Sequence, residues 1–204
     1  MKKEIRAFSF EVRAEQNDEY GHYLTGRPIV YNSRTDLGWY DEIIEQGALE
    51  RTDLRDVRFL VNHNTDMIPL ARSRNNTGNS TMQMTVDDEG MIIRVNLDTE
   101  NNSEARNLYS AVERGDIDGM SFMFVVDSET WEDAESDHPT RRINEILKVF
   151  EVSAVTWPAY EATTITARGL SDALDSARAS LDSERARLLQ IERRRKKIKI
   201  LTEV

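Results

Sequence analysis

The periodicity of the apolar residues changes once along this chain of 204 residues, at Arg168-Gly169. Before this point, short apolar runs alternate with polar residues at a period of two, as residues 5–13 do, and such alternation is typical of half-buried strands. After it, the sequence continues to its end without Gly or Pro, and its apolar residues recur at helical spacing. The change predicts a strand-rich body over residues 1–168 and a charged helical tail over residues 169–204.

The body contains several strand candidates and few helices. The predicted strands are residues 5–13, 57–62, 81–86, 91–97, 121–127 and 143–156. Residues 87–90, Asp-Asp-Glu-Gly, carry hairpin turn chemistry. A helix is predicted from Ser103 to Arg114 with a stop at Gly115, and a shorter one from Gln46 to Leu54. This pattern favours an α+β fold, with an antiparallel β-barrel surrounded by a few helices and followed by a C-terminal amphipathic helix.

The tail repeats leucine every seven residues. Leu174, Leu181 and Leu188 form this series, which is a plausible heptad seam. Two interpretations remain open: an amphipathic helix packed on its own body, or a helix that self-associates or binds a partner. The basic run at residues 193–197 is typical of a solvated helix end.

Charge and composition exclude several classes of protein. From Leu170 onward the chain carries nine basic and six acidic residues, so the tail is +3 and the body −13 within a net charge of −10. An acidic body makes nucleic acid an unlikely main ligand, because phosphate binding needs clustered Lys and Arg. The absence of cysteine excludes disulfides and cysteine nucleophiles. No apolar run approaches the roughly 18–20 residues that span a membrane, and no spacing of ligands predicts a metal or cofactor.

Three polar residues stand at positions where chemistry is possible. His63 ends an apolar run, between Asn62 and Asn64, so its ring would be carried at the rim of a sheet. Ser121 opens a second run after Asp-Gly-Met, although most serines at strand starts are inert and no Gly-x-Ser-x-Gly elbow is present. Glu151 lies among apolar residues, where a carboxylate needs a partner: an arginine, backbone amides, or a histidine. His22 and His138 fall in polar turns and are expected at the surface.

Five segments in order resemble the prohead protease family of tailed bacteriophages, serine peptidases similar to the herpesvirus assemblins. The segments are residues 26–31, 45–49, 59–64, 114–124 and 150–160. The resemblance spans about residues 4–168, and five ordered blocks are specific where one would be weak.

The resemblance implies a serine endopeptidase with His63 as general base, Ser121 as nucleophile and Glu151 as the third member of a triad. Glu145 is the fallback for the third position, because it shares a strand face with Glu151 under period-two alternation. Arg72 or Arg74 could orient the oxyanion, although surface solvation is the simpler expectation for both.

The resemblance also implies a substrate and a location. The expected substrate is the scaffold, or the scaffolding segment of the major capsid protein, with self-cleavage, inside the procapsid in the host cytoplasm. The helical tail would then be a docking element removed by self-cleavage. One alternative is a non-catalytic scaffold or capsid-binding protein, which the intact His63, Ser121 and Glu151 disfavour. Another is a carboxylate-based hydrolase, which the placement of most acids in polar loops disfavours.

Overall fold

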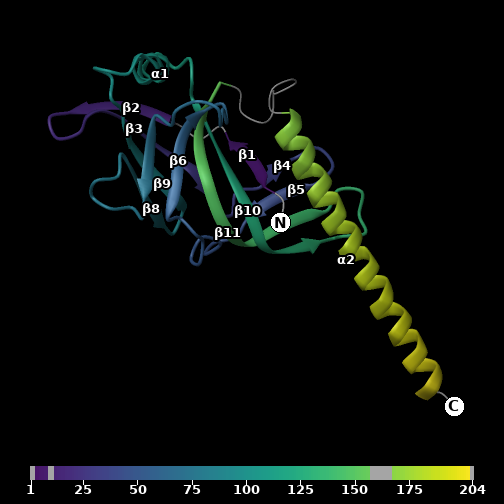
Figure 1. Cartoon of the computed structure of the whole chain (residues 1–204). Coiled ribbons are helices and arrows are strands. Elements are labelled where there is room, and N and C mark those ends of the chain that lie inside the picture. The colour runs from purple at the N-terminus through teal and green to yellow at the C-terminus, as the bar shows by residue number, and fades with distance from the viewer. Residues whose placement is uncertain (1–2, 9–11, 157–166, 203–204) are drawn as a thin grey trace.

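The computed structural model describes residues 3–8, 12–156 and 167–202, and these form a mixed α+β fold made mostly of strands (Figure 1). The strands are β1 (Glu4–Phe8), β2 (Val12–Asn17), β3 (Gly21–Val30), β4 (Thr35–Asp36), β5 (Asp41–Ile44), β6 (Asp56–Val61), β7 (Ala71–Arg74), β8 (Met82–Asp87), β9 (Gly90–Asn96), β10 (Gly119–Glu132) and β11 (Thr140–Val155). The helices are α1 (Ser103–Glu113) and α2 (Ala167–Thr202).

The strands form two sheets. The larger has seven strands in the order β1-β10-β11-β5-β4, with β6 also paired to β11 and β7 paired to β6; the smaller has the order β2-β3-β9-β8. β11 is antiparallel to β10 but parallel to β5 and to β6. The prediction of an antiparallel sheet is therefore wrong for these two pairs, and closure of the described strands into a barrel is not confirmed.

β11 organises the larger sheet because it is long enough to pair twice along one edge. Its first residues, Thr140–Ile143, pair with β5, and Glu151–Ala154 pair with β6. The chain between β5 and β6 forms tight turns, not the helix predicted over residues 46–54. Gly47 has φ +87° there, and the amides of Ala48 and Glu50 donate to carbonyls three residues earlier. A left-handed residue interrupts the four-residue bonding that an α-helix needs.

The predictions of α1 and of one hairpin are confirmed, whereas that of a strand over residues 5–13 is corrected. α1 begins after Asn102, whose side chain accepts from the amides of Glu104 and Ala105, and Gly115 follows its end with φ +76°. The predicted hairpin joins β8 to β9. The single strand predicted over residues 5–13 is instead divided between β1 and β2, which belong to different sheets.

The core lies between the two sheets and α1. It combines apolar side chains of β3, β8 and β9 with those of β6, β10, β11 and the buried face of α1. Phe122 and Val152 are directly opposed on β10 and β11, and both are fully buried. The alternate residues on these two strands therefore face away from this core, and the site residues lie there.

The first half of α2 packs on the body and the second half does not. Ala173, Ala177 and Leu181 are buried, whereas between residues 182 and 198 no side chain is buried and α2 extends away from the body (Figure 1). The interpretation of a helix packed on its own body therefore holds for the first half. Self-association through the exposed half stays a prediction. Among the described helices, none is long and apolar enough to cross a membrane.

Candidate active site

His63 lies in a strained turn directly after β6. Asn62 and His63 have φ values of 51° and 55°, a left-handed conformation that residues other than glycine seldom adopt. The amide of Asn62 donates to the carbonyl of Ala154 at 2.9 Å, and its side chain donates to Thr156 Oγ1 at 3.0 Å. These bonds fasten the turn to the end of β11. The imidazole is consequently held against the sheet, with 10% of its side chain exposed.

Glu151 of β11 is the partner of this imidazole. Its Oε1 lies 2.6 Å from His63 Nδ1, and its other oxygen, Oε2, accepts the hydroxyl of Ser153 at 2.5 Å. Glu151 is 2% exposed, and each of its carboxylate oxygens has a side-chain partner. Of the partners considered from the sequence, the histidine is the one that the fold supplies. His63 Nε2 is buried without a hydrogen-bond partner among the described residues.

Ser121 lies on the neighbouring strand β10, opposite Ser153 of β11 and Ala7 of β1. Directly opposed residues of an antiparallel pair share a face of the sheet, and so do residues two apart on one strand. Ser121 therefore faces the same side as Ser153 and Glu151. Its side chain is completely buried, and its Oγ donates to the carbonyl of Arg6 at 2.7 Å. Within the described residues no hydrogen bond joins it to His63.

A histidine paired to a carboxylate, with a serine on the same face of the sheet, provides the residue types that serine hydrolases use. The family model of the caudovirus prohead serine protease matches residues 8–176 of the chain. The chain belongs to this family. This prohead serine protease is also similar to the capsid assembly protease gp21 of bacteriophage T4, at 13% identity and a TM-score of 0.37, with 76% of this chain and 99% of that chain covered. No curated protein matches it.

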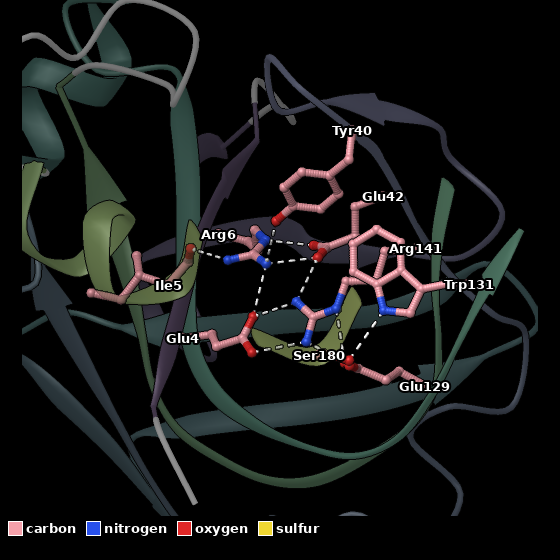
Figure 2. Close-up of polar contacts among 9 residues, drawn as sticks. All are labelled: Glu4, Ile5, Arg6, Tyr40, Glu42, Glu129, Trp131, Arg141 and Ser180. Carbon is pink, nitrogen blue, oxygen red and sulfur yellow. Dashed lines mark hydrogen bonds and ion pairs between the residues drawn. The ribbon is translucent and has the colours of Figure 1, made fainter. Parts of the chain in front are cut away.

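Arg6, whose carbonyl accepts the Ser121 hydroxyl, contributes its side chain to a buried network of charged groups (Figure 2). Arg6, 1% exposed, donates to Glu4 at 2.8 Å and to Glu42 at 2.6 Å. Arg141, equally buried, donates to Glu4 at 2.7 and 3.0 Å and to Glu42 at 3.1 Å. Burial alone would raise the pKa of Glu4, but the hydrogen bond from Arg141 and the charges of both arginines hold it below 4.5.

The same network reaches α2. Arg141 Nε donates to Glu129 at 2.8 Å, Glu129 accepts the hydroxyl of Ser180 on α2, and Trp131 Nε1 donates to Ser180 at 3.1 Å. Figure 2 shows these groups converging from strands far apart in the sequence. Tyr40 lines the network, and its burial raises its pKa to about 12. Sequence reasoning missed this cluster, because charged residues on separate strands give no local signal of burial.

Other candidates from the sequence lie outside the site. Glu145, the fallback acid, forms a surface ion pair with Arg51. Arg72 is held by Asp56 at 2.6 Å. His22 is half-buried, and its Nδ1 lies 2.8 Å from the hydroxyl of Thr99.

His138 is part of a possible metal-ligand group with Asp36 and Asp41. Asp41 is already bound by Arg34 at 2.6 Å and by His138 at 3.1 Å. These residues lie at the opposite end of β11 from Glu151, since β5 pairs with residues 140–143. We assign the group to surface ion pairing.

Proposed function

We propose that the chain is an endopeptidase that cleaves the scaffold, or the scaffolding segment of the major capsid protein, and itself during head maturation. Ser121 is the nucleophile, His63 the general base and Glu151 the acid that orients the base. The observation that carries the proposal is the 2.6 Å contact between His63 Nδ1 and Glu151. It leaves Nε2, which has no partner among the described residues, as the proton acceptor on the sheet that also carries Ser121.

The mechanism follows from these positions. With Nδ1–H donated to Glu151, the lone pair of His63 resides on Nε2. Nε2 takes the Ser121 proton as Oγ attacks a peptide carbonyl, and returns that proton to the leaving amine, so that an acyl-enzyme forms. Nε2 then takes a proton from water as the water oxygen attacks the acyl carbonyl, and returns it to Ser121 Oγ as the bond from Oγ to the acyl carbon breaks. Glu151 stabilises the imidazolium in each half-reaction. Acid–base catalysis of this kind contributes about 10²- to 10⁴-fold in rate.

Attack also requires one local rearrangement. A serine hydroxyl has one proton, and that of Ser121 is donated to the carbonyl of Arg6. This bond must be exchanged for one to His63 Nε2 before the hydroxyl becomes nucleophilic. The described conformation is therefore a resting one, in which the Ser121 hydroxyl is bonded to the backbone of β1.

We place the enzyme inside the procapsid, with scaffold and capsid protein as partners and no cofactor. Residues 1–168 form the protease domain in this proposal, and residues 169–204 form a tail for packaging or docking that self-cleavage removes. The exposed half of α2 is available for such contacts.

Co-expression with the cognate capsid and scaffold proteins tests the proposal, with the intact mass of every chain as the readout. Wild type is compared with Ser121→Ala and with Ser73→Ala, a matched control at another fully buried serine. We expect truncated capsid protein or protease in the wild type and the control, and full-length chains in Ser121→Ala. If all three samples are cut alike, Ser121 is not the nucleophile. If none is cut in assembled shells, the chain acts as a non-catalytic assembly protein.

A further inference from the structure

We propose that Ser153 is a positioning residue that holds both the acid and the base of the site, and that its hydroxyl is required for rapid catalysis by Ser121. The inference rests on the proposed function. Ser153 is completely buried on β11, directly opposite Ser121 and two residues from Glu151. Its hydroxyl makes one bond as a donor and one as an acceptor, and each goes to a different member of the catalytic pair.

The donated bond fixes the carboxylate. Ser153 Oγ donates to Glu151 Oε2 at 2.5 Å, while Oε1 of the same carboxylate faces His63 Nδ1 at 2.6 Å. The carboxylate is thus hydrogen-bonded at both oxygens, which fixes its plane relative to the imidazole ring of His63. Without the hydroxyl, Oε2 would be a buried charged oxygen with no donor. The carboxylate would then rotate or admit water, and either change breaks its alignment with Nδ1.

The accepted bond fixes the backbone of the base. The amide of His63 donates to Ser153 Oγ at 3.1 Å, and His63 is the second of two successive left-handed residues. Such a backbone persists only where its surroundings hold it in place. Asn62 is held separately, through Ala154 and Thr156. For His63 itself, the bond to Ser153 is the backbone restraint within the described residues.

The partners of these bonds distinguish Ser153 from the proposed nucleophile: its hydroxyl is bonded to Glu151 and to the His63 amide, whereas that of Ser121 is bonded to a backbone carbonyl of β1. The proton of Ser153 is committed to Glu151, and its oxygen faces the His63 amide rather than Nε2. The proton of Ser121 has only a neutral backbone carbonyl to leave, whereas that of Ser153 is held by the carboxylate that orients the base. Ser153 therefore acts through Glu151 and His63. It has a different role from Ser121, although the two serines are directly opposed on neighbouring strands.

The test measures two variants of Ser153 in the co-expression system, by the rate at which capsid protein is truncated in assembled shells. Ser153→Ala removes the hydroxyl, and Ser153→Cys keeps the size of the side chain but offers a weak donor. We expect processing to slow by about 10- to 100-fold in both, because a bond to a buried charged group is lost. Ser73→Ala is the matched control: Ser73 is also fully buried, and its hydroxyl has no partner. It should process at the wild-type rate.

A second readout separates positioning from general stability. In a Ser121→Ala background, the ring proton shared by His63 Nδ1 and Glu151 is observed by proton NMR in each variant. We expect its downfield resonance in the parent and in Ser73→Ala, and its broadening or loss in both Ser153 variants.

The outcomes are distinguishable from those of the proposed function. If wild type does not process at all, the proposed function fails. If wild type processes and Ser121→Ala does not, but the folded Ser153 variant processes at the wild-type rate or keeps the resonance unchanged, the positioning role of Ser153 is refuted while the nucleophile stands. Should Ser153→Ala fail to fold, Ser153→Cys decides by the same criteria.

Discussion

Replacement of Arg141 by methionine should strongly destabilise the protein. The guanidinium is 2% exposed and donates to Glu4, Glu42 and Glu129. Methionine fills most of its volume but leaves these carboxylates with Arg6 as their one remaining buried cation in this network. Breaking a buried ion pair from one side typically costs about 3–5 kcal/mol. For a chain of this size, 1 kcal/mol corresponds to about 2–4 °C in Tm, so the Tm should fall by roughly 6–20 °C.

Thermal unfolding followed by circular dichroism measures this loss, in a Ser121→Ala background that removes the proposed self-cleavage. The control is Arg114→Met, because Arg114 pairs with Asp116 at 2.6 Å and both side chains are more than half exposed. An exposed pair contributes about 0–1 kcal/mol, so the control should lose only about 0–4 °C. Equal Tm values for the two variants would refute the reasoning that the buried network holds β1, β5, β10 and β11 together.

Two further predictions concern a turn and the loss of stability at low pH. Gly90→Ala should prevent normal pairing of β9 with β3, because Gly90 has φ +141° and a Cβ there would lie 2.0 Å from the carbonyl oxygen of Ile29. Soluble yield and Tm are compared with those of the control Gly78→Ala, whose Cβ would meet nothing within 4 Å. A wild-type Tm for Gly90→Ala would contradict the prediction. The folded-state pKa of Glu4 lies below its ordinary value of 4.5, so the stability that its ionised form contributes is complete above that value and is lost as the pH falls through the lower, folded pKa. Tm measured against pH should therefore fall less steeply below about 4.5 in Glu4→Gln than in wild type, and identical slopes would show that Glu4 does not couple folding to protonation.

The local elements of this protein could be read from its sequence where one rule dominated. α1 has a capping residue, a buried stripe and a terminal glycine that agree, and it forms where predicted. The hairpin of β8 and β9 likewise follows from its turn. Residues 46–54 mixed helix-forming residues with Gly47, and the left-handed glycine prevailed, because one such residue stops continuous helical hydrogen bonding.

The candidate site was found from ordered motifs, but its geometry was not. His63 and Glu151 were named from the sequence, whereas their contact depends on the parallel pairing of β6 with β11, and pairing partners leave no trace in the periodicity of either strand. Ser153 gave only a weak signal, its position two residues after Glu151.

Periodicity and motif order by themselves determined the strand-rich body, the helical tail and the three residues proposed for catalysis. Tertiary structure alone decided that two sheets form, that β11 pairs in parallel along one edge, and that Arg6 and Arg141 are buried with their carboxylates. The physical reason is the separation in sequence over which each interaction acts. Backbone propensity and turn chemistry act between neighbours, whereas Arg141 meets Glu4 across 137 positions, and a charge enters a core only where distant strands deliver its counter-charges together.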